Sequence, residues 1–554
     1  MENNEAHAMS EKRFNIPVSG ILLITGFAAY YNIAHAFFLS DDFDQIGKVR
    51  AGDLSVVWGR EHGGFFRPLF ILSYWMDVKL WNANPLGFHL TNIAFHTANA
   101  FLLFILTRRL IARFDSTPRL TRDVSLAAAL IFLLLPSHTE AVSWISGRAD
   151  LLAAFFSLAS LIAYVSYLRA NRLSRIVFAL LFFALALLSK EAAICLPFVM
   201  LIIGGASAFQ ESSAAIFKRT LKIVSVFALA LFAFICLRYL ALGSLVGGYG
   251  ASQHLNFSPA WMRDRLIQAT LRAVLPPLPL QLSAVLLKPL KSPAFLLFAV
   301  LCAGLIAALI VHRHRRQDAA ARKPQNIFTA QLIASFLCCL LPVINLRLGL
   351  YDTQGERFLY LPSVFSSIAT AYIAFIFLRR RSAWLSLMGC LLIFYSFVLY
   401  RSNENWRQAA KISQAIVVDI AASSGHNNLL ILNAPDNLKG APVFHNGLEA
   451  ALKDFQPAKQ LKEIRLIALH NLQSANDEIE LTGDETELNE HPRSFTLRLR
   501  NEACAFERVD DQSSCVAIRN RAKTFFQFQT GDCLSDTDTF VFDRGRMLKV
   551  MTSQ

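Results

Sequence analysis

The chain has 554 residues, of which 54% are hydrophobic and only 17% are charged, with a formal net charge of +14. Soluble domains carry about 25% charged residues, so the composition excludes an ordinary soluble protein and indicates a polytopic membrane protein. The basic balance alone would suggest nucleic-acid binding, but most Lys and Arg residues lie in short loops between apolar segments.

Apolar stretches recur along the first 400 residues, and each approaches the roughly 20 residues that a helix needs to cross a bilayer. They are 18–39, 88–107, 124–143, 150–168, 174–189, 192–209, 221–242, 293–311, 327–346, 358–378 and 383–401. The first stretch lacks a small-residue cleavage site, so we expect a retained anchor rather than a removed signal peptide.

Every second loop between these stretches is basic, which predicts that the basic loops share the cytoplasmic side with the N-terminus. These loops carry Arg108, Arg109, Arg113, Arg119 and Arg122; Arg169, Arg172 and Arg175; Lys218, Arg219 and Lys222; Arg313, Arg315, Arg316, Arg322 and Lys323; and Arg379, Arg380 and Arg381. The opposite side receives loops 40–87, 137–149, 189–191, 243–292 and 347–357, together with the C-terminal tail. Most of the positive charge is therefore a topology signal, and we predict no nucleic-acid partner.

The tail has the pattern of a small α+β domain. The segment NENWRQAAKISQAIVVDIAA, within 403–424, predicts a connecting amphipathic helix, and alternating runs such as RSFTLRLR and DTFVFDRG predict strands. We therefore divide the chain into a transmembrane region at 1–402, the connecting helix at 403–424 and an extracytoplasmic domain at 425–554. The predicted fold class is an α-helical polytopic membrane protein of about eleven transmembrane helices followed by this α+β domain.

Two tail cysteines flank the segment AFERVDDQSS, which has short strand-like pieces on either side of a polar turn. If these pieces pair as a hairpin, Cys504 and Cys515 would face each other at bridging distance. The predicted location outside the cytoplasm permits such a disulfide.

An acidic cluster, FFLSDDFDQI at 37–46, follows the first apolar stretch. One interpretation is that Asp41, Asp42 and Asp44 only hold a helix end at the membrane interface. The other is a carboxylate base at a membrane-edge cleft, with Asp41 or Asp42 as the base and Asp44 in a structural role.

Other loops on the same side carry charges at membrane depth, where they usually face a cavity or a partner. We predict that cations here bind a donor phosphate and that other polar groups line the cavity. The predicted phosphate-binding residues are Arg357, Arg148, Lys190 and Arg67, with Tyr360 beside them, and the predicted cavity residues are His138, Glu140, Asp150, Glu191 and Glu356. The alternative for Arg357 is an ion pair with Glu356 or Asp352 that only orders its loop.

The second apolar stretch carries His89, Asn92, His96 and Asn99 on one helical face. Such a stripe serves either interhelical hydrogen bonding or a substrate cavity, and we include His89, Asn92 and His96 among the cavity candidates. The HTE sequence at 138–140 supplies at most two metal ligands, so no metal site is predicted and dependence on a divalent metal stays open.

Carboxylates and cations together at the outer membrane face suit the transfer of a sugar from a lipid phosphate. Arg and Lys would stabilise the charge that grows on the phosphate, and a carboxylate would accept the proton of the attacking hydroxyl. The expected partners are a polyprenyl-phosphate sugar donor, the membrane, and a protein, glycan or lipid acceptor.

Four motifs resemble, in order, those of the GT-C glycosyltransferases related to the transmembrane and tetratricopeptide-repeat O-mannosyltransferases. They are FFRPLFILSYWMDVKLWNANPLGFHLTNIAFHTANAFLLFILTRRL, LPSHTEAVSWISGRADLLAAFF, LLSKEAAICLP and ERFLYLPS. The resemblance implies a polyprenyl-phosphate donor and a catalytic aspartate at the Asp41-Asp42 pair, with the first acid favoured. The repeats of the animal enzymes are absent, and an α+β domain stands in their place.

Two other classes of protein compete with a transferase. A transporter or flippase of lipid-linked sugars also needs intramembrane charge, but its charges should cluster at the bilayer midplane. A non-catalytic scaffold gives no reason for the acidic pair, SGRAD and SKE to share one side. A lone sequon at Asn256 and the absence of a retention signal favour a bacterial inner membrane, with the site on the periplasmic side.

Overall fold

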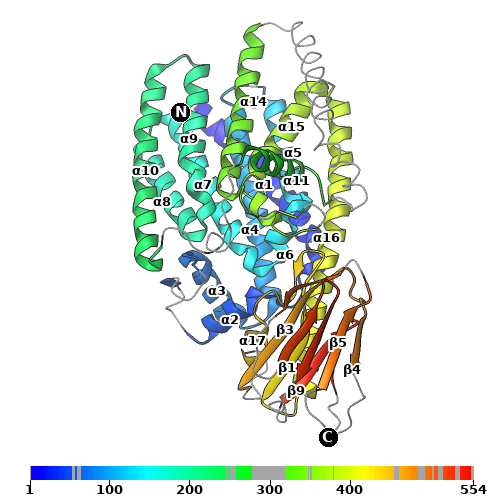
Figure 1. The fold of residues 1–554 in the computed structure, drawn as a ribbon. Coiled ribbons are helices and arrows are strands. Elements are labelled where there is room, and N and C mark those ends of the chain that lie inside the picture. Colours follow the sequence, from blue (N-terminus) through cyan, green and yellow to red (C-terminus); the bar gives the residue numbers. More distant parts are fainter. Residues whose placement is uncertain are drawn as a thin grey trace.

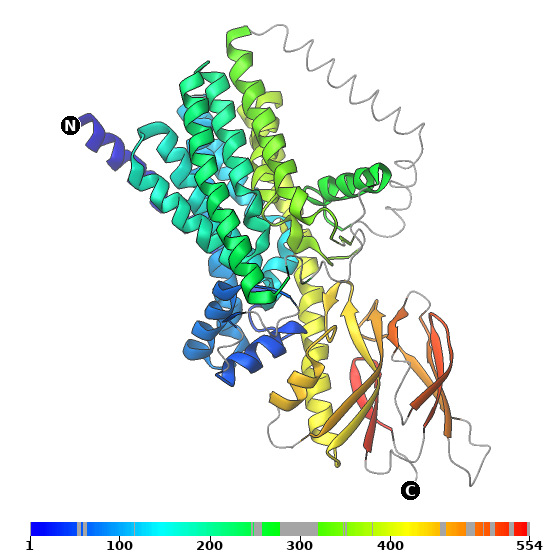
Figure 2. The same ribbon diagram turned by 60° about the vertical axis from the view of Figure 1, so that its left-hand side comes forward.

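The computed structural model describes the chain apart from residues 1, 53–56, 59–63, 116, 245–247, 249–257, 278–318, 347, 350–351, 379, 455–460, 484–492, 502–503, 510–515, 531–536 and 551–554. A bundle of long apolar helices is joined at one end to a domain of two β-sheets, and helix α16 runs from the bundle into that domain (Figure 1, Figure 2).

The helices of the described chain are these: α1 (Glu2–Ala29), α2 (Asp41–Arg50), α3 (Pro68–Trp81), α4 (Pro85–Ile111), α5 (Pro118–Leu134), α6 (Thr139–Ser143), α7 (Arg148–Ala170), α8 (Leu173–Ser189), α9 (Leu196–Gln210), α10 (Ala214–Leu242), α11 (Pro259–Arg272), α14 (Ala319–Leu340), α15 (Ser363–Leu378), α16 (Arg381–Ser423) and α17 (Leu448–Asp454). The strands are β1 (Asn428–Leu438), β2 (Ala441–Pro442), β3 (Glu463–Leu472), β4 (Ile479–Gly483), β5 (Arg493–Leu499), β6 (Ala505–Val509), β7 (Val516–Arg521), β8 (Phe525–Thr530), β9 (Thr537–Asp543) and β10 (Arg546–Lys549).

The predicted fold class, a helical membrane protein with a small sheet domain, is confirmed. Within the described residues, 6 helices are long and apolar enough to cross a membrane, or 7 if the bent pair Pro118–Leu134 and Pro136–Ser143 is one span. Shorter apolar helices, Ile16–Ala29, Leu173–Ser189 and Ser363–Leu378, occupy three further predicted stretches. The predicted stretch 293–311 lies outside the described residues.

Two predicted boundaries differ from the structure. Helix α1 ends at Ala29 rather than near residue 39, and a short 3₁₀ helix and irregular chain lead from it to α2. Helix α16 is continuous for 43 residues, so the last predicted span and the predicted connecting helix are one helix. The division of the chain at residue 402 stays a prediction.

The bend after α5 follows from Pro136. The ring of a proline disfavours the helical region for the residue before it, and Leu135 is extended at φ −62° and ψ 120°. The chain therefore turns by 54° between α5 and the following short helices. Gly147 then closes the bend, because a Cβ there would lie 2.5 Å from the carbonyl oxygen of Ala141.

The described basic loops, after α4, α7, α9 and α15, lie together at one end of the bundle, whereas Arg313, Arg315, Arg316 and Arg379 lie outside the described residues. The guanidinium of Arg219 donates to the Asn171 side chain at 3.0 Å, which joins the loop after α7 to the start of α10. Arg381 bonds to Asp123 at 2.7 Å across the same end.

The tail domain contains two sheets. The first has the order β10-β9-β1-β3-β6, with β2 paired to β1, and β1 lies parallel to both β3 and β9. The second is antiparallel, with the order β4-β5-β8-β7. Alternation along β1 sends Leu429 and Ile431 into the main core and Leu430 and Leu432 into a smaller core with residues of both sheets.

The tail domain is fixed to the start of α2 by the loop after β2. The backbone amide of Ser40 donates to the carbonyl of Val443 at 3.0 Å, and the amide of Asn446 donates to the Ser40 hydroxyl at 3.1 Å. Gly447 has φ +81°, and a Cβ on it would lie 2.2 Å from the Ser40 carbonyl oxygen. Only glycine permits so close a contact.

The predicted tail hairpin is wrong. Strand β6 pairs with β3 in the first sheet, whereas β7 pairs with β8 in the second, so the segments next to the two cysteines do not face each other. Cys504 is a buried free thiol whose Sγ lies 3.1 Å from a carboxylate oxygen of Asp477. Cys515 lies outside the described residues.

Candidate active site

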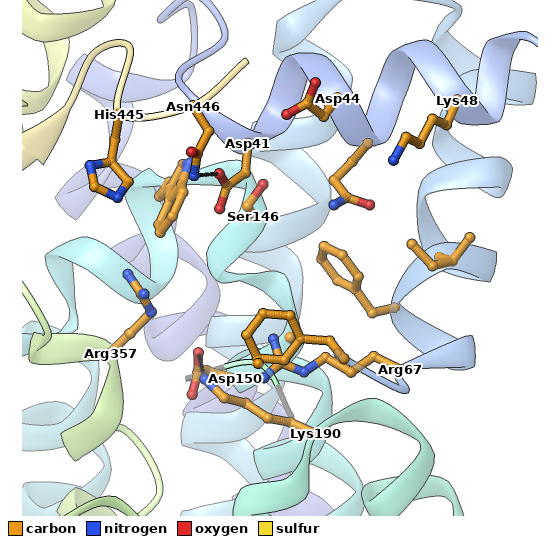
Figure 3. Close-up of a pocket in the computed structure, with 17 residues that line it drawn as sticks. Asp41, Asp44, Lys48, Arg67, Ser146, Asp150, Lys190, Arg357, His445 and Asn446 are labelled. Carbon is orange, nitrogen blue, oxygen red and sulfur yellow. Dashed lines mark hydrogen bonds and ion pairs between the residues drawn. The ribbon is translucent and has the colours of Figure 1, made fainter. Parts of the chain in front are cut away.

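A cavity of about 410 Å³ lies between the end of the bundle opposite the basic loops and the tail domain. The residues that line it are Asp41, Asp44, Gln45, Lys48, Phe65, Arg67, Phe70, Ile71, Trp144, Ser146, Ala149, Asp150, Lys190, Gly248, Arg357, His445 and Asn446. Figure 3 shows Asp41 on one wall, with Asp150, Lys190 and Arg67 on the opposite wall and Arg357 to one side.

Asp41 is the first residue of α2, and its carboxylate borders the cavity. It is partly exposed, and its Oδ1 accepts a hydrogen bond of 2.9 Å from the side-chain amide of Asn446 (Figure 3). Its position depends on the tail domain, because Asn446 and Ser40 hold the start of α2 against the loop after β2. Asp41 is thus a carboxylate open to a ligand and oriented from outside its own helix.

Asp42 lies beneath the cavity rather than in it. Its side chain is buried, and its oxygens accept hydrogen bonds from the backbone amide of Leu39 at 3.0 Å and from the amide and hydroxyl of Ser146 at 2.9 and 2.5 Å. Burial raises the pKa of this carboxyl from 3.8 to about 7, against the opposing effect of these hydrogen bonds. The predicted acidic pair is therefore divided between a cavity carboxylate and a buried one.

Arg357 enters the cavity from the 3₁₀ turn Glu356–Leu359 and is held by a buried carboxylate. Glu140 accepts a hydrogen bond from the Arg357 backbone amide at 2.8 Å and forms an ion pair with its guanidinium. The guanidinium also lies 4.8 Å above the Trp144 ring. Of the two predicted alternative partners, Glu356 and Asp352, Glu356 instead pairs with Arg272. Glu140 is thus not a cavity residue but a group that positions Arg357.

Lys190 and Arg67 supply positive charge to the opposite wall. The Lys190 ammonium lies 2.6 Å from Asp150, which also lines the cavity. Arg67 bonds to Glu191 at 2.9 Å, and Arg238 bonds to the other oxygen of Glu191 at 2.7 Å. Glu191, predicted to line the cavity, joins two arginines behind its wall.

Arg148 does not line the cavity, contrary to its predicted role in phosphate binding. Its side chain is fully buried, with the guanidinium 2.6 Å from Asp77 and further hydrogen bonds to Asn92 at 2.8 Å and to the Phe88 carbonyl at 3.0 Å. These bonds occupy the guanidinium inside the protein. Arg148 therefore joins α7 to α3 and α4.

The polar stripe of α4 forms interhelical hydrogen bonds and does not line the cavity. Its contacts run from His89 to the carbonyl of Ala36, from Asn92 to carbonyls of 142, 144 and 145, and from His96 and Asn99 to Tyr360. His138 bonds to Ser363 at 2.7 Å. The structure therefore gives structural roles to Tyr360, His89, Asn92, His96 and His138. A buried stripe that bonds neighbouring segments has the same sequence pattern as a stripe that lines a polar cavity.

Several cavity residues were not predicted. Lys48 and Gln45 lie on α2 within two turns of Asp41, and Asp44, predicted to be structural, lines the cavity as well. The helical spacing 41, 44, 45, 48 was the available signal, since these positions share one face. His445 and Asn446 gave no such signal, because they reach the site only through the fold of the tail domain. A hydrogen bond to Asp436 raises the pKa of His445 above its ordinary value.

The charges of the cavity suit a ligand that combines an anion with a reacting hydroxyl. Its cations are Lys48, Arg67, Lys190 and Arg357, and its carboxylates are Asp41, Asp44 and Asp150. Within the described part of the chain, no three His, Cys, Asp or Glu side chains are grouped so that they could hold a metal ion.

The chain is similar in sequence to protein O-mannosyl-transferases of animals. It is 35% identical over 154 residues to one from Caenorhabditis elegans, covering 26% of this chain and 21% of that protein. It is 32% identical over 189 residues to Tmtc1 of Drosophila melanogaster, covering 30% and 20%, and 32% identical over 174 residues to TMTC3 of Homo sapiens, covering 28% and 18%. The chain thus spans about a fifth of the length of these relatives, and the resemblance that the four motifs indicated is confirmed.

No family model matches the chain. Among solved structures, it is similar to ArnT from Cupriavidus metallidurans bound to undecaprenyl phosphate, with a TM-score of 0.45, 10% identity and coverage of 94% and 98%. It is also similar to the Archaeoglobus fulgidus oligosaccharyltransferase complex with Zn and sulfate, with a TM-score of 0.42, 10% identity and coverage of 82% and 67%.

Proposed function

We propose that this protein is an integral-membrane glycosyltransferase that moves a sugar, mannose or another hexose, from a polyprenyl-phosphate donor to a hydroxyl acceptor. The observation that carries the proposal is one cavity in which the Asp41 carboxylate faces Arg67, Lys190 and Arg357 (Figure 3). The printed activity of the animal relatives supports transfer of mannose.

The proposed reaction is a direct displacement. The acceptor hydroxyl oxygen forms a bond to the anomeric carbon, the bond from that carbon to the phosphate oxygen breaks, and the electron pair leaves with the polyprenyl phosphate. Asp41 accepts the hydroxyl proton, as a general base within hydrogen-bond reach does. Arg357, Lys190 and Arg67 stabilise the negative charge that grows on the phosphate. A single displacement inverts the anomeric configuration.

Helix α3 supports the entry of a lipid donor beside these cations. Phe70 and Ile71 of this helix line the cavity. Other α3 side chains are exposed on the outside, including Trp75 at 42%, Met76 at 58% and Leu80 at 69%. Exposed apolar and Trp side chains at the end of a membrane bundle suit the lipid interface. A prenyl chain along α3 would place its phosphate at the cavity cations.

We further propose a bacterial cytoplasmic membrane, with the cavity and tail domain on the periplasmic face. The described basic loops occupy the end of the bundle opposite the cavity, and such loops remain cytoplasmic. A transporter or flippase of lipid-linked sugars is less well supported, because the cavity and its charges lie at one end of the spans rather than at the midplane.

Mass spectrometry of cell-envelope glycans and glycoproteins, with and without the gene, tests the proposal. We expect one hexose-bearing product to disappear on deletion and to return with the wild-type chain but not with Asp41→Asn. An unchanged envelope, or full rescue by Asp41→Asn, would contradict it.

A further inference from the structure

A second cavity adjoins the first on the side of the tail domain. Its volume is about 390 Å³, and α2, α17 and β3 with the loop after β2 form its walls. The two cavities share the residues Asp41, Asp44, Gln45, His445 and Asn446. The carboxylate of Asp41 therefore borders both spaces.

The two cavities differ in charge. Among the described residues, the second is lined by the carboxylates of Asp41, Asp44 and Glu449 and by His445, but by no Lys or Arg. The first has three carboxylates and also four cations, Lys48, Arg67, Lys190 and Arg357. Glu449 forms an ion pair of 2.6 Å with Lys453 on the outside of α17, and its side chain is 64% exposed. An anionic phosphate would be repelled from the second cavity, and a neutral or basic group would be accepted.

The apolar part of the second cavity's lining is mainly aliphatic. It is formed by Leu448, Ile464, Leu466 and Leu469, together with Phe444. The Phe444 ring stacks on Phe43 with 5.8 Å between ring centroids, which covers one of its faces. Aliphatic side chains of a polypeptide bury their surface favourably against a wall of this kind.

We propose that the second cavity receives the acceptor, which is a polypeptide segment with a hydroxyl side chain and aliphatic or basic neighbours. This inference rests on the proposed transfer and assigns its two substrates to separate spaces that meet at Asp41. The donor phosphate occupies the cationic cavity, and the acceptor hydroxyl reaches Asp41 from the tail domain. The contacts of Ser40 with Val443 and Asn446 keep the second cavity formed without a ligand.

The test measures peptide binding to the full chain in nanodiscs, without any donor. The probes are fluorescein-labelled pentapeptides with a central threonine and leucine neighbours, flanked by lysine in one and by glutamate in the other. We expect the lysine-flanked peptide to bind at least tenfold more tightly. Ile464→Lys should weaken it about tenfold or more, because it adds bulk and positive charge to the cavity wall.

Glu463→Lys is the matched control, since Glu463 adjoins Ile464 on β3 but does not line the cavity. It should change the affinity less than threefold. Glu449→Gln, at an exposed position that does not endanger folding, should reduce the preference for lysine over glutamate. Equal effects of Ile464→Lys and Glu463→Lys, no charge preference, or binding of an oligosaccharide instead of either peptide would overturn the inference.

A second measurement separates this inference from the proposed function. The same nanodiscs are incubated with the lysine-flanked peptide and polyprenyl-phosphate mannose, and sugar on the threonine is measured by mass spectrometry. Binding that depends on Ile464 without transfer counts against the glycosyltransferase proposal. Transfer that is equal in wild type and Ile464→Lys counts against the acceptor cavity.

Discussion

The replacement Asp41→Asn is the sharpest test of the site, because it removes the proton acceptor and keeps the shape of the side chain. A positioned general base contributes about 10²- to 10⁴-fold to a rate, which corresponds to about 3 to 5 kcal/mol of transition-state stabilisation. We expect a loss of transfer in this range.

The same replacement should leave the fold almost unchanged. Asp41 is partly exposed, and an asparagine oxygen still accepts the hydrogen bond that Asn446 donates at 2.9 Å. Surface changes that keep such contacts alter the free energy of unfolding by about 0.5 kcal/mol or less. A large loss of rate with an unchanged unfolding temperature would therefore report on chemistry.

Asp44→Asn is the matched control, since Asp44 lies on the same helix and lines the same cavity. At saturating acceptor, transfer of labelled sugar from polyprenyl-phosphate mannose should fall less than threefold in this variant. Both are assayed in nanodiscs, with donor binding and thermal unfolding measured on the same samples. Retention of more than a tenth of the wild-type rate in a folded Asp41→Asn variant would refute the role of Asp41 as base.

Arg357→Ala should weaken donor binding by about ten- to 150-fold, since a charged hydrogen bond contributes about 1.5–3 kcal/mol. Arg357→Lys should restore only part of this affinity, because a point charge does not reproduce the planar fork of a guanidinium. Unchanged binding of labelled polyprenyl phosphate would remove Arg357 from the site. Arg148→Ala should instead lower the free energy of unfolding by about 3–5 kcal/mol, because it leaves Asp77 as an unpaired buried charge. An unaltered unfolding temperature would contradict the structural role of Arg148. Asp42 has a folded-state pKa raised from 3.8 to about 7, so the folded chain keeps a proton that the unfolded chain releases. Stability should therefore fall by about 4 kcal/mol as pH rises from about 4 to above 7, a slope that Asp42→Asn should lack. Burial helps to raise the pKa of the Cys504 thiol to about 12, so this thiol should react with a maleimide only after the protein is unfolded, and no reductant should be needed. If it does not react in the unfolded protein without reductant, Cys504 is bonded to another cysteine.

The sequence by itself determined the helical membrane class and the positions of most spans. It also determined that the loops carrying the site residues lie on the side of the membrane opposite the basic loops. Hydropathy and the distribution of Lys and Arg are local properties, and the bilayer restricts a chain to helices of set length with basic loops on one side. Asp41, Asp150, Lys190, Arg67 and Arg357 could be proposed for the cavity because charges at membrane depth need a partner or a water-filled space.

Only the tertiary structure decided which of these charges face the cavity. Arg148 and Arg357 both lie in loops next to apolar stretches, yet Asp77 holds Arg148 inside the bundle while Glu140 leaves Arg357 at the cavity wall. Asn446 lies 405 residues from Asp41, and no local pattern marks their contact. The pairing of an ion, the partner of a strand and the wall of a cavity depend on distances between segments remote in the chain, and these distances exist only after the helices and the tail domain have packed together.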